Sequence, residues 1–280
     1  MSHYFKGLTL LIFFINISVF CNAQTQIFDS LTVDSTTFVN TKNKINQLSI
    51  ESFKKQKFTQ QQVELPYRLL LPKNYNQSQK YPLVITFHNS SRIGNDNEKQ
   101  LEPLAKIWLR PEIYDNFPCF VIAPQFNKRS SNYTKQADGI LSSIPSDDVN
   151  LVLKLIDSVS LKYGNIDKSR IYLVGYSMGA STAQNLMTID AKKFAAIVSI
   201  AAVPDLSNLR AFKNKNMLLI HGQNDTENPY NGSVELAKKL KNNKKLIFKT
   251  YINLNHDNIN IPFLLSDEIP KWLFKQKNKT

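Results

Sequence analysis

The sequence predicts an α/β protein in which helices cover both faces of a mostly parallel sheet. Short apolar runs of the buried-strand type alternate with segments of helical periodicity along most of the chain. This alternation is typical of parallel sheets, because a chain that leaves one strand must cross back before it can start the next. The chain has 280 residues, of which 42% are hydrophobic, so it can bury one sizeable core.

The expected strands are apolar runs bounded by polar or turn-forming residues. They lie at 63–71, 82–87, 120–123, 171–174, 194–201, 217–220 and 246–252. The expected helices lie at 97–109, 146–163, 178–188, 233–240 and 263–275. Ser146 is the expected N-cap of the second of these helices. In such sheets ligands and chemistry gather at the carboxyl ends of the strands, so the candidate site residues are those that follow the strands.

Residues 1–23 have the pattern of a cleaved secretory signal peptide. Lys6 precedes the apolar run 8–20, and Ala23 precedes polar sequence. The run is shorter than the roughly 20 residues that span a bilayer, which disfavours an uncleaved anchor. Lipid attachment at Cys21 is a weaker alternative, because the residue before this cysteine is a bulky phenylalanine. We therefore expect a secreted or periplasmic protein without a membrane span.

The segment 24–52 is rich in Ser, Thr, Asn and Gln and has little apolar patterning, so we expect an N-terminal extension or spacer there. The α/β domain is expected over 53–280. Removal of the leader leaves Cys119 as the only thiol, so no internal disulfide is expected. Its neighbours are apolar, which favours a buried core cysteine over a nucleophile.

The chain is strongly basic, with a formal net charge of +13. The positive residues are mostly lysines, concentrated at 238–249 and at the C-terminus, and no arginine cluster or nucleic-acid-binding motif accompanies them. Acidic polysaccharide or another anionic surface is therefore a better partner than nucleic acid. No Cys/His cluster, carboxylate loop or glycine-rich phosphate loop occurs, so no metal or other cofactor is expected. Nothing in the sequence predicts an oligomeric state.

The most specific motif is the run Gly175-Tyr176-Ser177-Met178-Gly179, which follows an expected strand and opens an expected helix. With 8 glycines and 23 serines in the chain, the pattern G-x-S-x-G has about 0.02 chance occurrences. A turn this tight needs small flanking residues, and it presents the serine oxygen above a helix N-terminus. The motif predicts that Ser177 is a nucleophile.

A serine hydroxyl needs a base, and the base needs a carboxylate that orients it. Two residues after Ser177 follow expected strands in the order acid and then histidine, namely Asp225 and His256. We therefore expect a catalytic triad of Ser177, Asp225 and His256. Asp205 is a rival acid, and Asp257 is a weaker one.

The oxyanion hole is expected to combine the backbone N–H of Met178 with one from the loop 89–91, in particular that of Ser90. His88 and His221 also follow strands. Structural roles are favoured for both, with His221 bracing the loop that carries the acid.

Taken together, these motifs resemble the secreted α/β-hydrolases described as predicted peptidases, phospholipases/carboxylesterases or polysaccharide-esterase-like enzymes (feruloyl and acetyl esterases). The resemblance covers roughly residues 60–276 and implies the α/β-hydrolase fold, with Ser177 as nucleophile, Asp225 as acid and His256 as base. The matching stretches are 67–72, 81–84, 94–97, 121–125, 170–179, 221–225, 256–257 and 272–274.

One loop departs from the family pattern. The family has His-Gly-x-Gly-Glu-Arg-Gly after its first core strand, whereas this chain has His88-Asn89-Ser90-Ser91-Arg92-Ile93-Gly94. Asparagine tolerates a positive φ better than most residues, so we expect Asn89 to adopt one and to keep the loop on its path. The tryptophan that often follows the family histidine is absent, and Asn258 and Ile259 stand there instead.

The sequence thus favours a secreted serine hydrolase that cleaves carboxylic esters through an acyl-enzyme. Small-molecule esters and acyl esters on polysaccharide are the expected substrates. A serine peptidase of the same fold is an alternative, because esterases and peptidases share these catalytic parts. A non-catalytic binding or accessory protein with an altered oxyanion loop is another.

Overall fold

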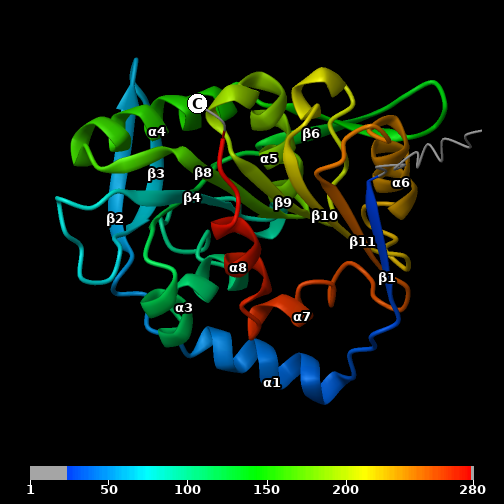
Figure 1. The fold of residues 1–280 in the computed structure, drawn as a ribbon, viewed down its shortest axis with the longest axis horizontal. Helices are drawn as coiled ribbons and strands as arrows, with labels where there is room; N and C mark the ends of the chain where they lie inside the picture. Colours follow the sequence, from blue (N-terminus) through cyan, green and yellow to red (C-terminus); the bar gives the residue numbers. More distant parts are fainter. Residues whose placement is uncertain (1–23, 279–280) are drawn as a thin grey trace, which may run out of the picture.

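The computed structural model describes residues 24–278, and it confirms the predicted α/β class (Figure 1). The signal peptide predicted at 1–23 lies outside the described residues. The strands are β1 (Thr25–Asp29), β2 (Lys54–Gln60), β3 (Val63–Leu70), β4 (Tyr81–Phe87), β5 (Phe120–Pro124), β6 (Ser131–Lys135), β7 (Leu141–Pro145), β8 (Ile166–Tyr176), β9 (Ala196–Ile200), β10 (Asn216–Gly222) and β11 (Leu246–Tyr251). Within this described part, no helix is long and apolar enough to cross a membrane.

Eight α-helices and four 3-10 helices connect these strands in the described part of the chain. The α-helices are α1 (Ser35–Asn46), α2 (Pro103–Lys106), α3 (Pro111–Asn116), α4 (Val149–Tyr163), α5 (Met178–Ile189), α6 (Tyr230–Lys239), α7 (Ile261–Leu264) and α8 (Glu268–Phe274). The 3-10 helices are η1 (Ser90–Arg92), η2 (Ile107–Leu109), η3 (Ala191–Lys193) and η4 (Leu209–Phe212).

Nine of the strands form one sheet in the order β1-β11-β10-β9-β8-β4-β5-β3-β2. All neighbours from β1 to β5 pair in parallel, whereas β3 pairs antiparallel with both β5 and β2. The strands β6 and β7 form a separate antiparallel pair. The carboxyl ends of β8, β10, β11 and β4 therefore meet at one edge of the sheet, which is where the predicted site residues follow.

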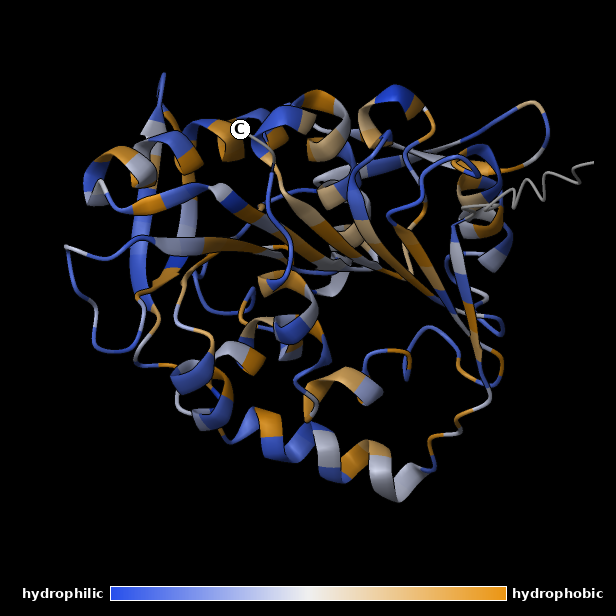
Figure 2. Ribbon diagram, viewed as in Figure 1, coloured by the Kyte–Doolittle hydropathy of each residue, from blue (hydrophilic) through white to orange (hydrophobic). Residues whose placement is uncertain are grey.

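The sheet separates two hydrophobic cores, and helices cover both of its faces (Figure 1). Helices α4, α5 and α6 pack on one face, and α1, α2, α3, α7 and α8 pack on the other. In β4 the side chains alternate between the two cores, with Leu83 and Ile85 in one and Val84 in the other. Central strands buried on both faces are apolar nearly throughout, as Figure 2 shows, and this explains why their runs stand out in the sequence.

The N-terminal segment, predicted to be an extension or spacer, holds two elements of the fold. Strand β1 pairs with β11 at the edge of the sheet, and α1 places Ile45, which is fully buried, in the core. The weak patterning has a structural cause. β1 is largely exposed, and α1 buries only Thr41 and Ile45, so neither element shows a broad apolar face.

Several predicted boundaries are wrong, each for a local reason. Ser146 does not cap α4, because the helix begins only at Val149, after Asp148 at the N-cap position. The helix predicted over 97–109 is reduced to α2 and η2. The helix predicted over 263–275 is divided into α7 and α8, each with a proline in its first turn, where the missing N–H costs no hydrogen bond.

Candidate active site

The tight turn between β8 and α5 places Ser177 at the carboxyl edge of the sheet. Its backbone has φ 56° and ψ −127°, a strained conformation for a residue with a side chain. A Cβ at Gly175 would lie 2.3 Å from the carbonyl oxygen of Gly179, and one at Gly179 would lie 2.2 Å from that of Phe87. Both glycines of the motif are therefore required by close backbone approach.

The structure brings Ser177, His256 and Asp225 together in one hydrogen-bonded chain. The Oγ of Ser177 lies 2.9 Å from Nε2 of His256, and Nδ1 of His256 lies 2.7 Å from Oδ2 of Asp225. The three residues are 6–7% exposed. Because a carboxylate only accepts hydrogen bonds, Nδ1 carries the hydrogen, and Nε2 is left free to accept the serine proton. This is the geometry of a nucleophile, a base and an orienting acid.

Asp225 is held in the ionised state by several donors. Its Oδ1 accepts the backbone N–H groups of Glu227 at 3.0 Å and Asn228 at 2.9 Å. Its Oδ2 lies 3.2 Å from Nε2 of His221, in addition to its contact with His256. Burial alone would raise the pKa of Asp225, but the hydrogen bonds from the two histidines lower it well below its ordinary value.

His221 braces the loop that carries Asp225. Its Nε2 lies between two acceptors, Oδ2 of Asp225 and the carbonyl oxygen of Asn228 at 2.9 Å, so this nitrogen carries the hydrogen. Its Nδ1 can then accept the Ser233 hydroxyl at 2.7 Å. The ring is fully buried, as suits the structural role predicted from the sequence.

The two rival acids lie elsewhere. Asp205 is fully buried, and its side chain accepts from Asn185 at 2.8 Å, from Thr188 at 2.6 Å and from Ser207, with no contact to the His256 ring. Asp257 is exposed on the loop beside His256. The contacts of the described residues therefore leave Asp225 as the acid that reaches His256.

Two residues that the sequence did not single out contact His256. The ring of Tyr176 lies 5.1 Å from the imidazole ring, and its hydroxyl donates to the backbone carbonyl of His256 at 2.8 Å. The exposed carboxylate of Glu227 lies 3.6 Å from Nε2 of His256 and places a negative charge beside the serine. Tyr176 is a variable position of the motif and Glu227 lies on a loop, so no sequence pattern marks either.

The two predicted oxyanion donors both open helices. Ser90 is the first residue of η1 and Met178 the first residue of α5, so neither N–H has an acceptor within its own helix. The loop reaches this position differently from the prediction. Asn89 has φ −76°, so the predicted positive φ is wrong. Asn89 instead caps η1, because its Oδ1 accepts the N–H of Ser91 at 2.9 Å.

His88 ties this loop to the end of β5. Its Nδ1 lies 2.8 Å from the carbonyl oxygen of Asn89, and its Nε2 lies 3.1 Å from the backbone N–H of Phe126. Nδ1 must therefore donate and Nε2 must accept, which is the neutral ring. Burial lowers the pKa of His88 to about 4, in agreement with this assignment.

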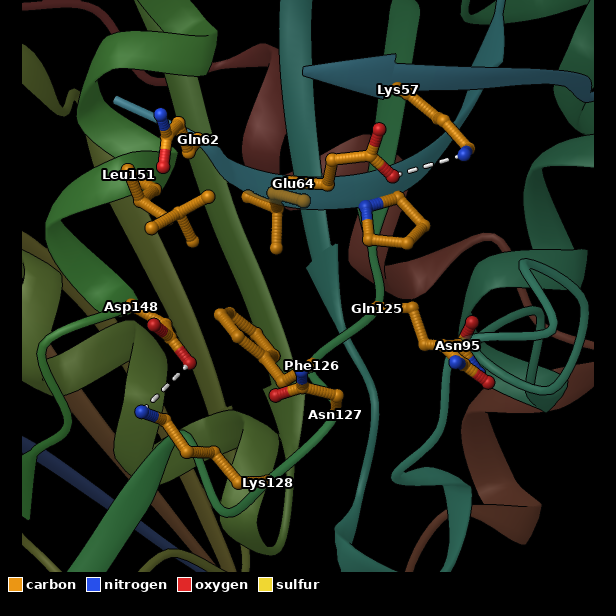
Figure 3. A pocket seen from close by; sticks show the side chains of 13 residues that line it. Lys57, Gln62, Glu64, Asn95, Gln125, Phe126, Asn127, Lys128, Asp148 and Leu151 are labelled. Carbon is orange, nitrogen blue, oxygen red and sulfur yellow. Dashed lines mark hydrogen bonds and ion pairs between the residues drawn. The ribbon is translucent and has the colours of Figure 1, made fainter. Parts of the chain in front are cut away.

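A polar cavity of about 520 Å³ lies beyond His88, between the β2–β3 hairpin and the start of α4 (Figure 3). Phe126, whose backbone N–H contacts His88, is part of its lining. Since neighbouring strands are spaced by about 4.8 Å, the end of β5 lies about 10 Å from that of β8. Two ion pairs border the cavity, Lys57 with Glu64 at 2.9 Å and Lys128 with Asp148 at 3.4 Å. Amide and apolar side chains complete its lining, namely Gln62, Val63, Leu65, Pro66, Asn95, Gln125, Phe126, Asn127 and Leu151.

Cys119 directly precedes β5, lies in the hydrophobic core and is 3% exposed. Burial raises the pKa of its thiol, which keeps the sulfur protonated and unreactive. Cys119 is thus buried as predicted, and its protonated thiol is not suited to act as a nucleophile.

A nine-stranded, mostly parallel sheet with a strained serine at a strand–helix turn defines the class of α/β-hydrolases. Solved structures with this fold include a thermostable esterase, which is 30% identical with a TM-score of 0.72 and is matched over 81% of this chain and 64% of its own. An acylaminoacyl peptidase from Pyrococcus horikoshii is 15% identical, with a TM-score of 0.57 over 82% of this chain and 43% of its own. A CE1 ferulic acid esterase from Anaeromyces mucronatus is 16% identical, with a TM-score of 0.55 over 75% of this chain and 85% of its own.

The sequence profile of the phospholipase/carboxylesterase family matches residues 127–262. The chain has the α/β-hydrolase fold, and its predicted resemblance to this family is confirmed. It spans about two fifths of the length of the acylaminoacyl peptidase and 64% of that of the thermostable esterase. No curated protein sequence matches the chain.

Proposed function

We propose that this chain is a secreted serine hydrolase that cleaves carboxylic esters through an acyl-enzyme. The observation that carries the proposal is the continuous contact from Ser177 Oγ to His256 Nε2 and from His256 Nδ1 to Asp225. The strained backbone of Ser177 and the two helix-opening N–H groups beside it support the same assignment.

In the first half-reaction, His256 Nε2 takes the proton of Ser177 Oγ while Oγ attacks the ester carbonyl carbon. The carbonyl oxygen becomes negatively charged and accepts hydrogen bonds from the backbone N–H groups of Ser90 and Met178. Collapse of the tetrahedral intermediate breaks the ester C–O bond, and the leaving alcohol receives the proton from Nε2. Water then attacks the acyl-enzyme by the same steps and releases the acid.

Asp225 contributes by stabilising the imidazolium that forms in each step. It stays ionised, because its pKa is held well below the ordinary value, so it does not compete for the proton. His221 and the N–H groups of Glu227 and Asn228 keep the carboxylate in place while the charge on His256 changes.

The polar cavity beyond His88 favours an ester whose alcohol or acyl part carries many hydroxyl groups. Its amide side chains, among them Asn127 and Gln62, offer donors and acceptors of the kind that bind sugars. Acyl esters on polysaccharide are therefore the substrate class that we propose.

The test is hydrolysis of p-nitrophenyl acetate, p-nitrophenyl butyrate and methyl ferulate by the wild type and by Ser177→Ala. We expect the variant to remain folded and to lose about 10⁴–10⁶-fold in kcat, because removal of the nucleophile disables the whole triad. A fluorophosphonate should label the wild type at Ser177 only. A variant that keeps a tenth of the wild-type activity would contradict the assignment. Faster turnover of a peptide than of any ester would favour a peptidase.

Export is tested separately by expression in a bacterial host and sequencing of the mature N-terminus. Cleavage after Ala23 gives a chain that begins with Gln24. A protein that keeps Met1, or that carries lipid on Cys21, contradicts the proposed cleavage.

A further inference from the structure

A buried carboxylate outside the triad lies against the predicted oxyanion loop. Glu102, at the start of α2, is 4% exposed. Its Oε2 accepts two hydrogen bonds from Asn89, one from the backbone N–H at 3.2 Å and one from Nδ2 at 2.7 Å. Its Oε1 is buried and has no hydrogen-bond partner among the described residues. A carboxylate this deeply buried is costly, so its contacts need an explanation.

The partner of this carboxylate, Asn89, is fixed at every polar group. Its Oδ1 accepts the N–H of Ser91 at 2.9 Å and the Ser91 hydroxyl at 2.7 Å. Its carbonyl oxygen contacts Nδ1 of His88 at 2.8 Å and the backbone N–H of Arg92 at 3.1 Å. With the two bonds to Glu102, the residue has no freedom to rotate its backbone independently.

This matters for Ser90, because the carbonyl of Asn89 and the N–H of Ser90 belong to the same peptide group. A trans peptide is planar, so its N–H points to the side opposite its carbonyl. The carbonyl is turned toward His88 and Arg92 by hydrogen bonds. The Ser90 N–H therefore points in the opposite direction, away from His88 and Arg92, and is not engaged by these partners.

The same contacts show why Asn89 itself is not the donor in the hole. Its backbone N–H is already engaged by Glu102. The family places glycines in this loop, and this chain has Asn89 and Ser91 instead. In this chain a side-chain clamp, made of Glu102, Asn89 and Ser91, fixes a loop path without any residue at positive φ.

We propose that Glu102 is a positioning residue for the oxyanion hole, which acts through Asn89 to hold the N–H of Ser90 toward the developing oxyanion. This inference rests on the proposed esterase function, since an oxyanion forms only if Ser177 attacks a carbonyl. Glu102 does not touch the substrate. Its effect is on the transition state, because only there does the carbonyl oxygen carry the charge that the N–H stabilises.

The experiment compares Glu102→Ala with Glu102→Gln on p-nitrophenyl acetate. The alanine variant loses the acceptor, so we expect kcat to fall about 10–100-fold with KM changed less than about threefold, somewhat less than the loss of a whole oxyanion donor. Glutamine keeps a side-chain oxygen that can accept both N–H groups of Asn89, so we expect kcat within about threefold of the wild type. Asp205→Asn, which alters another buried carboxylate away from Ser177, is the matched control and should leave kcat unchanged.

A second readout separates positioning from a general loss of structure. A trifluoromethyl ketone adds to Ser177 and forms an oxyanion in the hole, so its Ki should rise in Glu102→Ala by the same factor by which kcat/KM falls. Asn89→Ala removes the partner side chain of the same clamp, and we expect a similar loss of kcat. It serves as the test variant if Glu102→Ala does not fold. Because both variants break the same contact, their effects in the double variant should not add.

Three results would overturn the inference. Glu102→Ala with wild-type kcat would show that the clamp is dispensable, and Glu102→Gln as impaired as Glu102→Ala would show that the accepting oxygen is not what matters. A loss of kcat with an unchanged Ki for the ketone would place the defect outside the oxyanion hole. Failure of the esterase proposal looks different, since the wild type would then neither hydrolyse esters nor react with a fluorophosphonate, and both proposals would fall.

Discussion

At the scale of single residues, the assignment that most needs a direct test is that of the acid. Asp225 and Asp205 are both buried aspartates that follow strands, but only Asp225 contacts His256, at 2.7 Å. Asp205 hydrogen-bonds the end of α5 through Asn185 and Thr188. Their sequence contexts are similar, and their surroundings in the fold are not.

We predict that Asp225→Asn lowers kcat about 10³–10⁴-fold, whereas Asp205→Asn stays within about threefold of the wild type. An asparagine can present its NH₂ group to Nδ1 of His256, which favours the wrong tautomer and leaves the imidazolium unsupported. Steady-state kinetics of both variants on p-nitrophenyl butyrate measure the difference. The reverse ranking would reassign the acid to Asp205.

The buried carboxylate of Glu102 also makes a prediction about stability. Burial raises its pKa to about 7, although the hydrogen bond from Asn89 and the charges of Arg92 and Lys42 act in the opposite direction. Burial raises the pKa of Tyr176, and the charge of Glu102 adds to this effect. A carboxyl whose pKa is raised by folding favours the folded state only while it is protonated, so its contribution is lost as the pH rises from about 4.5 to about 7.

We compare the free energy of unfolding of Glu102→Gln with that of the wild type at each pH. We therefore expect this difference to favour the variant more at pH 8 than at pH 5. The gain between these values should approach about 3 kcal/mol, since each pKa unit corresponds to about 1.4 kcal/mol. Urea unfolding of both proteins at pH 5, 6, 7 and 8 measures it. A difference that does not vary with pH would show that Glu102 has an ordinary pKa in the folded protein.

At the scale of elements, the sequence predicted the buried parts best. Strands β4, β5 and β10 are mostly apolar, because helices cover both faces of the sheet there. Their predicted ends lie within one or two residues of the observed ones. Strand β2 is lysine-rich and lies at the edge of the sheet, where charged residues prevent pairing with another chain, so it shows no buried-strand pattern.

In the candidate site, the sequence singled out the three residues that the structure brings together, but not the other residues that contact them. The order of serine, acid and histidine after strands depends on topology, which a pattern can capture. Tyr176, Glu102 and Glu227 reach the site through contacts between segments far apart in the sequence, and no local pattern marks such contacts. The conformation of Asn89 was predicted wrongly for the same reason, since its partner Glu102 lies thirteen residues further along the chain.

Helix α1 provides a test of whether residues 24–52 are part of the fold. We predict that Ile45→Ala lowers the free energy of unfolding by about 2–4 kcal/mol, because the side chain is fully buried in the core. Val39→Ala on the same helix, where the side chain is 50% exposed, should change it by less than about 0.5 kcal/mol. If both substitutions change the free energy of unfolding by equally small amounts, the segment is a spacer that does not contribute to the stability of the fold.

At the scale of the whole molecule, charge is the dominant feature. The net charge of +13 gives the protein a positive potential that attracts polyanions over distances beyond direct contact. The contacts among Ser177, His256 and Asp225 are buried and hence little affected by salt. The two properties can be separated by choosing substrates that differ in charge.

We predict that hydrolysis of an acetylated pectin slows roughly fivefold between 20 and 200 mM NaCl, whereas hydrolysis of p-nitrophenyl acetate changes by less than about 1.5-fold. Initial rates at low substrate concentration report kcat/KM and so include the long-range attraction. Acetylated xylan of low charge serves as the polymer control. Equal salt dependence of both polymers would show that the positive charge of the protein has no part in substrate capture.

The pairing of β1 with β11 has a consequence for how the protein is made. Thr25 and Ile247 are partners in this edge pair although they are 222 positions apart in the sequence. During synthesis or passage through a translocation pore, one of these two strands emerges first. It has no pairing partner until nearly all of the remaining chain has emerged. Until then β1 is an unpaired strand, and such strands invite pairing with other chains. The sheet can therefore be completed only near the end of synthesis or translocation, and a chaperone that shields β1 has until then to act.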